Sequence, residues 1–97
     1  MATYISLVNL TDQGVRTMKD LAQRFQNAEQ TFASMGAQLK EIYMVMGEYD
    51  YVVLAEAPDD TTMARITLAI AGQGNVRTQT FRAFDRSEAL ELVEGLP

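Results

Sequence analysis

The chain has 97 residues, of which 47 % are hydrophobic, and carries a net charge of −5. This length predicts one small domain spanning residues 1–97, and the hydrophobic content is sufficient for a packed core. The eight Lys and Arg residues are spread along the chain without forming a cluster, which argues against a nucleic-acid partner.

The absence of Cys and His limits the chemistry that the chain could perform. Without Cys there is no disulfide, no thiolate zinc site and no Cys nucleophile. Without His the commonest general base and the commonest transition-metal ligand are missing, so we expect no cofactor. The N-terminus does not resemble a signal peptide and no apolar stretch approaches a membrane span, so we expect a cytoplasmic protein with no membrane partner.

The first third of the chain predicts a strand followed by a long helix. Thr3 to Leu10 is rich in Ile, Leu, Val and Tyr, as strands are. Thr11 or Asp12 offers an N-cap for a helix that runs to about Met35. Apolar residues recur in that helix at intervals of three, four and seven: Val15, Met18, Leu21, Ala22, Phe25, Ala28, Phe32 and Met35. Gly36 is then expected to end the helix in a left-handed conformation.

The remaining two thirds predict three strands and two helices, bounded by turn residues. They are a strand at Ala37 to Met46, a turn at Gly47, a strand at Tyr49 to Ala57, a helix capped by Asp59 or Asp60 that ends at Ile70 or Ala71, a strand at Asn75 to Phe84, and a short acidic helix from Asp85 or Ser87 to near Gly95. The resulting order of strands and helices predicts an α+β, ferredoxin-like βαββαβ fold. It has a four-stranded antiparallel sheet, two helices on one face and a short C-terminal helix.

Two helices on one face leave the other face of the sheet uncovered. If the Gly47 loop has an even number of residues, one face carries Tyr51, Val53 and Ala55 with Lys40, Ile42 and Met44, and the other carries Asp50, Val52, Leu54 and Glu56 with Leu39, Glu41, Tyr43 and Val45. The first strand adds either Ile5 and Leu7 or Tyr4, Ser6 and Val8 to a given face. Neither face is polar throughout, which is typical of a sheet covered on both sides. We therefore expect a homo-oligomer, with two sheets facing each other as in a dimeric α+β barrel; the alternative is a monomer with scattered surface apolar residues.

Five residues are candidates for ligand binding, and each has an alternative role: Tyr43, Gly47, Tyr49, Asp50 and Arg77. Gly47 suits a tight turn as well as a ligand contact. Asp50 could cap backbone groups at the turn, hold the ammonium or hydroxyl of a ligand, or act as a base. Of Tyr49 and Tyr51, we expect one to pack in the core with its hydroxyl bonded, and the other to line a pocket or interface. Arg77 and Arg82 lie on opposite faces of the fourth strand and could pair with an acidic ligand, with Asp50 or with another subunit.

Several short motifs resemble those of the GYD domain family. They are Gly47-Glu48-Tyr49-Asp50, Tyr4-Ile5-Ser6-Leu7 leading into Thr11-Asp12-Gln13-Gly14, Glu56-Ala57-Pro58-Asp59-Asp60, Gly74-Asn75-Val76-Arg77-Thr78 and Arg82-Ala83-Phe84. This resemblance covers nearly the whole chain and implies a ferredoxin-like fold in the dimeric α+β-barrel group. The stretch from Gly47 to Tyr51 is also similar to the effector-binding domain of leucine-responsive regulators. That family implies amino-acid sensing between subunits, but its helix-turn-helix has no counterpart in this sequence.

Three functions are compatible with these patterns. The first is a homo-oligomeric module that binds or senses a small molecule of unknown identity. The second is a cofactor-free oxygenase or isomerase, an enzyme type found in the dimeric α+β-barrel group, in which Asp, Glu, Tyr or Arg would supply the chemistry. The third is a purely structural assembly protein.

Overall fold

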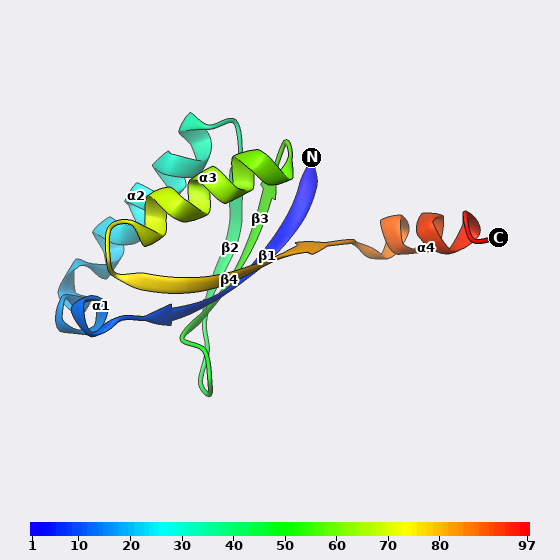
Figure 1. The fold of residues 1–97 in the computed structure, drawn as a ribbon. Coiled ribbons are helices and arrows are strands. Elements are labelled where there is room, and N and C mark those ends of the chain that lie inside the picture. The colour runs from blue at the N-terminus through cyan, green and yellow to red at the C-terminus, as the bar shows by residue number, and fades with distance from the viewer.

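A computed structural model describes residues 1–97. Its elements are β1 (Ala2–Leu10), α1 (Asp12–Arg16), the short 3₁₀ helix η1 (Met18–Asp20), α2 (Leu21–Ser34), β2 (Gln38–Met44), β3 (Tyr51–Ala57), α3 (Asp60–Ala71), β4 (Val76–Ala83) and α4 (Arg86–Glu94). The strands form one antiparallel sheet in the order β2-β3-β1-β4. Helices α2 and α3 cover one face of this sheet (Figure 1). The predicted ferredoxin-like α+β fold is confirmed.

The register of the central strand β1 decides which side chains face the helices. Tyr4, Ser6 and Val8 are buried and alternate with half-exposed residues along the strand. They lie opposite Ala55, Val53 and Tyr51 of β3, so all six point toward α2 and α3. The core lies there and consists of Tyr4, Phe32, Ala37, Ala55, Ala57, Met63 and Ile66. The predicted grouping of Tyr51, Val53 and Ala55 with Ile42 and Met44 is confirmed by the β2–β3 register.

The prediction of one unbroken helix from Thr11 to Met35 is wrong, because the chain first makes the short helix α1 and then η1. Thr11 caps α1 and also donates a hydrogen bond from its Oγ1 to the Gly74 carbonyl. Gly14 lies so close to the Asn75 carbonyl that a Cβ there would collide with it. These contacts hold α1 against the start of β4, so the chain must change direction before α2 can cross the sheet. As a consequence Val15, predicted to face the core, is 56 % exposed.

The predicted faces of Lys40 and Leu39 are also wrong, because a β-bulge interrupts the β2–β3 pairing. Leu39 lies opposite Ala55 and packs against the core, while the next paired residue, Glu41, lies opposite Leu54. The extra residue, Lys40, pairs instead with Glu56 on the far face at 3.6 Å. A bulge shifts the alternation of faces by one position, and an unbroken period of two does not anticipate it.

The helix stop, the hairpin turn and the second helix behave as predicted. Gly36 ends α2 with a φ of +71°, and Gly47 has a φ of +119° at the tip of the β2–β3 hairpin. The hairpin loop covers residues 45–50. Strand β2 therefore ends at Met44 instead of Met46, and β3 begins at Tyr51 instead of Tyr49. Asp59 caps α3 by accepting a hydrogen bond from the Thr62 amide.

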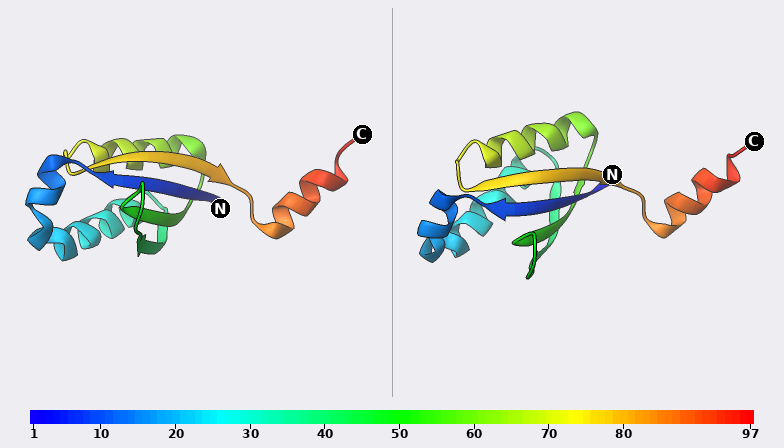
Figure 2. Two further views of the ribbon diagram at one scale, coloured as in Figure 1. Left: turned by 90° about the horizontal axis from the view of Figure 1, so that it is seen from below. Right: turned by 60° about the horizontal axis from the view of Figure 1, so that its bottom comes forward.

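Helix α4 begins as predicted but extends away from the rest of the molecule, as two further views show (Figure 2). Asp85 and Glu88 form a capping box at its start. Arg82 joins the helix to β4, because its guanidinium pairs with Glu88 at 3.3 Å and lies over the Phe84 ring. The apolar residues of this segment remain exposed: Leu90, Leu92, Val93 and Leu96. None of the helices combines the length and apolar character needed to span a bilayer.

Candidate functional site

The Asp50 carboxylate completes the hydrogen bonding of β1. Its Oδ2 accepts a hydrogen bond of 2.8 Å from the Leu10 amide, at a point where β3 has not yet begun. The Asp50 amide donates to the Val8 carbonyl, and the Asp50 carbonyl accepts from the Val45 amide. Of the three roles considered for Asp50, the structure shows a hydrogen bond to a backbone amide, although this amide belongs to Leu10 of β1 and not to the turn.

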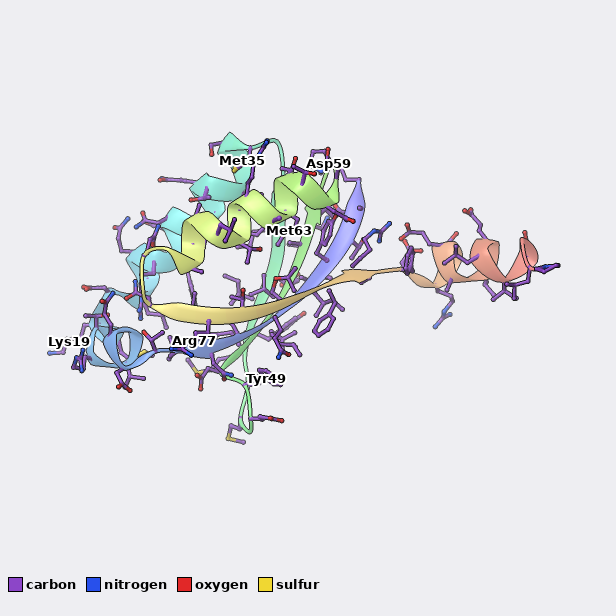
Figure 3. All side chains as sticks on the ribbon, viewed as in Figure 1. Lys19, Met35, Tyr49, Asp59, Met63 and Arg77 are labelled. Atoms are coloured by element: carbon purple, nitrogen blue, oxygen red, sulfur yellow. The ribbon has the colours of Figure 1, made fainter.

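Tyr49, Tyr43 and Arg77 reach the uncovered side of the sheet, which we call the open face. The Tyr49 hydroxyl donates a hydrogen bond of 3.1 Å to the Gln79 side chain of β4, across the end of β1. Arg77 lies opposite Asn9 of β1, and both alternate away from the buried residues. Figure 3 shows Tyr49 and Arg77 on the side of the sheet away from α2 and α3.

The five predicted ligand-binding residues therefore divide into two groups. Tyr43, Tyr49 and Arg77 present polar groups at the hairpin end of the open face, and Tyr43 is 56 % exposed. Gly47 serves the turn and Asp50 serves the backbone. Arg82, on the opposite face from Arg77 as expected, pairs with Glu88 rather than with Asp50.

The centre of the open face is apolar. It consists of Ile5, Leu7, Val52, Leu54 and Phe81, with Tyr43 at one side. Polar residues surround this centre: Thr3, Asn9, Lys40, Glu41, Glu56, Arg77 and Gln79. No helix of the chain covers it, and Phe81 is 51 % exposed (Figure 1).

A second apolar space, partly open to solvent, lies between the sheet and its two helices. It has a volume of about 110 Å³ and is lined by 20 residues, 14 of them hydrophobic. Helix α2 packs mainly over β2, and α3 mainly over β4. The central strands β1 and β3 therefore form the floor of this cavity, with Val8 and Val53 among its lining residues.

Two polar atoms of the cavity-lining residues are buried without a hydrogen-bond partner, namely Arg24 Nε and the Tyr51 hydroxyl. Tyr51 packs edge-on against Phe25, with ring centroids 5.8 Å apart. Burial raises the pKa of Tyr51 above its ordinary value, and the positive charge of Arg24 partly offsets this effect. Tyr51 is thus the core tyrosine that was expected, but the expectation that its hydroxyl is bonded is wrong.

Arg24 was not among the residues expected to bind a ligand, although its place in the helix carries a signal. Arg24 follows Leu21 by three residues and precedes Ala28 by four, so it falls on the apolar stripe of α2 rather than on its polar side. The Arg24 Nη2 donates to the Gly14 carbonyl at 3.2 Å, so this side chain also links α2 to α1. An arginine within an apolar helical stripe needs an internal partner, and that requirement points to the cavity.

The buried Tyr4 is hydrogen-bonded to an acidic side chain of α3. The Tyr4 hydroxyl donates to Asp60 Oδ1 at 2.5 Å, and burial followed by this bond raises the pKa of Tyr4 to about 12. Tyr4 therefore stays protonated and cannot act as a base near neutral pH. No three acidic side chains converge in a metal-binding arrangement.

Replacing Asp50 tests its backbone role. Asp50→Ala leaves the Leu10 amide without its acceptor and should lower the free energy of unfolding by about 1.5–3 kcal/mol in a urea titration. Asp50→Asn keeps a side-chain oxygen and should recover most of this loss. An Asp50→Ala variant within about 0.5 kcal/mol of wild type would contradict this role.

Comparison with solved structures shows the same fold in bacterial regulators. The feast or famine regulatory protein from M. tuberculosis complexed with L-methionine is similar with a TM-score of 0.63 and 20 % identity, over 89 % of this chain and 55 % of that one. The transcriptional regulator NMB0573 from Neisseria meningitidis, also in complex with L-Met, gives a TM-score of 0.63 and 15 % identity, over 88 % and 51 % of the two chains. The chain thus spans about half the length of these regulators.

Proteins of similar length are closer in sequence. TTHA0845 from Thermus thermophilus is 27 % identical with a TM-score of 0.54, over 89 % of this chain and 100 % of that one. The "Glutamine synthetase and cystathionine beta-lyase binding protein" of Thermus thermophilus is 37 % identical over 84 residues, which is 86 % of this chain and 88 % of that protein. The family model of the GYD domain matches residues 4–93. The chain belongs to the GYD domain family.

Proposed function

We propose that this chain is a cytoplasmic, homo-oligomeric module that binds a small molecule, and that its subunits pair through their open faces. The apolar centre of that face carries the proposal. A contiguous apolar patch that no part of the chain covers is a usual mark of an interaction site. Two such faces packed together would form the dimeric α+β barrel that the GYD resemblance implies.

The size of the open face indicates that α4 takes part in the pairing. Four strands of seven to nine residues present a face on the order of 500 Å². A stable interface buries about 800 Å² per partner, so the face alone is too small. Helix α4 has nine residues, too few for a helix to be stable by itself in water. The exposed Leu90, Leu92 and Val93 of α4, with Leu96 just after it, would supply both the missing area and the missing support for the helix by packing on a second copy.

The hairpin end of the open face supports ligand binding between paired sheets. Tyr43, Tyr49 and Arg77 place two hydroxyls and a guanidinium beside an apolar floor, which is a common composition for a small-molecule site. Arg77 would hold a carboxylate, and Asp50 and Gly47 would shape the adjacent turn. Two regulators of the same fold were solved with methionine, which makes amino acids the first ligand class to test.

A thermal-shift panel of the amino acids tests this ligand site. A ligand at a hundred times its Kd stabilises the folded state by about 2.7 kcal/mol, which should raise the Tm of a domain of this size by about 10 °C. Arg77→Ala should abolish the shift, whereas Lys19→Ala, a change in η1 away from the open face, should not. If neither amino acids nor small carboxylic acids shift the Tm, the structural-assembly function is favoured instead.

Light scattering tests the pairing of the subunits. The wild-type protein should be an oligomer at micromolar concentration, and Leu7→Glu should convert it to a monomer because the new carboxylate would be buried without a partner. Ala64→Glu adds the same charge on the exposed side of α3 and should leave the oligomer intact. A monomeric wild-type protein would refute the proposed assembly.

A second candidate function, the binding of metabolic enzymes, is favoured by the Thermus relative and its name. The outer surface of α3 would remain available after the sheets pair, and Leu68 on it is 72 % exposed. Calorimetric titration with purified glutamine synthetase and cystathionine β-lyase should then give saturable binding. Leu68→Ser should weaken it, whereas Val15→Ser, which alters an exposed apolar residue on α1, should not. Failure to bind either enzyme would exclude this candidate.

A further inference from the structure

The cavity between the sheet and its two helices combines an apolar wall with two buried polar groups that lack partners. Arg24 Nε and the Tyr51 hydroxyl are the two buried side-chain polar atoms in the chain without a hydrogen bond, and both residues line this one cavity. A buried polar group left unpaired costs about 1–3 kcal/mol, so native proteins seldom leave one without a partner. Two in one cavity therefore point to an occupant.

The charge of Arg24 indicates what kind of group the occupant carries. Neither ion pair in the chain includes Arg24, since they join Lys40 to Glu56 and Arg82 to Glu88. Its Nη atoms are turned to neutral partners, among them the Gly14 carbonyl and Thr17 Oγ1. The guanidinium is thus a half-buried cation without an anion, and its Nε is fully buried. A carboxylate that accepts from Arg24 Nε and the Tyr51 hydroxyl would satisfy both groups.

The rest of the cavity indicates an apolar body and the absence of an amino group. Phe25, Ile42, Val53 and Ile70 are among the hydrophobic residues that line it, and no Asp or Glu does. The ammonium of an amino acid would therefore have no anionic partner there, and burying it unpaired would be costly. An apolar cavity of about 150 Å³ accommodates the six carbon atoms of benzene, so about 110 Å³ suits a body of about four or five carbon atoms.

We infer that this cavity is a binding site for a small apolar monocarboxylate, held at its carboxylate by Arg24 and Tyr51. The site lies within one subunit and is separate from the amino-acid site proposed on the open face. It therefore depends neither on subunit pairing nor on Arg77. Water is the competing occupant, and polar lining residues such as Ser6, Thr67 and Thr78 could bond it, but a neutral water would leave the charge of Arg24 without an anion.

Calorimetry with three probes of one carbon skeleton tests the ligand class. 4-Methylpentanoate should bind, while leucine, its amino derivative, and 4-methylpentan-1-ol, which lacks the charge, should bind at least tenfold more weakly. Equal binding of the alcohol would reduce the site to a plain apolar cavity, and equal binding of leucine would refute the exclusion of amino acids. No binding of 4-methylpentanoate would refute the inferred site.

Two variants and a control test the proposed contacts. Arg24→Gln and Tyr51→Phe should each weaken 4-methylpentanoate about ten- to a hundredfold. Tyr51→Phe removes only an unpaired hydroxyl and should not lower the midpoint of urea unfolding, so its loss of affinity would not reflect misfolding. Arg77→Gln, on the open face, should bind the probe as wild type does. Unchanged affinity in both cavity variants would overturn the inference.

Methyl NMR distinguishes failure of this site from failure of the proposed function. 4-Methylpentanoate should shift the methyl signals of Val8, Ile42 and Val53 in the cavity and leave those of Ile5, Leu7 and Leu54 on the open face unchanged. Shifts confined to the open face would refute the cavity site and leave the proposed function standing. Oligomer dissociation by Leu7→Glu without loss of 4-methylpentanoate binding would show that the two sites are independent.

Discussion

The register of β1 between β3 and β4 is the constraint on which the rest of the structure depends. It points Tyr4, Ser6 and Val8 toward the helices, and Ile5 and Leu7 away from them. A slip of one residue would exchange these two sets. The core, the cavity and the open face are therefore all consequences of a single alignment. Asp50, which directly precedes β3, adds one hydrogen bond to this alignment by accepting from the Leu10 amide.

The same alignment explains why one face is closed and the other is open. The chain has two helices long enough to cover a sheet, α2 and α3, and both follow strands whose connections place them on the same face. The third candidate, α4, leaves the molecule in line with β4 and covers nothing in its own chain (Figure 2). The apolar residues of the open face and of α4 are therefore both left uncovered by their own chain. In the proposed assembly, one neighbouring copy would bury both sets.

The internal cavity has a comparable origin in the spacing of the helices. Because α2 lies over β2 and α3 over β4, the residues of the central strands beneath the gap must fill the space between the helices by themselves. A small side chain, Ser6, stands at one of these positions. The side chains of the floor therefore do not fill the space between the helices. The residues that line this space include both Arg24 and Tyr51. A site of this kind arises from what the packing leaves empty rather than from any local motif.

Much of this molecule follows from its sequence alone. The order of the elements, the caps at Asp59 and Asp85, the left-handed Gly36 and the pairing of faces around Tyr51 all depend on local periodicity and turn chemistry, which neighbouring residues determine. The sequence also grouped Tyr43 with Val52 and Leu54 on one face once the hairpin loop was taken as even, but it did not decide which face of the fourth strand the helices cover. These features required no knowledge of distant contacts.

Other features were decided only by the tertiary structure, because they depend on residues far apart in the chain. The break between α1 and α2 arises from contacts of Thr11 and Gly14 with the turn before β4. The bulge moves Lys40 to the other face of the sheet, and no glycine or proline in β2 indicates a bulge there. Asp50 accepts a hydrogen bond from the Leu10 amide because the fold brings the end of β1 beside it. Arg24 and Tyr51 come to line one cavity only when α2 packs on the sheet, and no pattern within either segment contains that information.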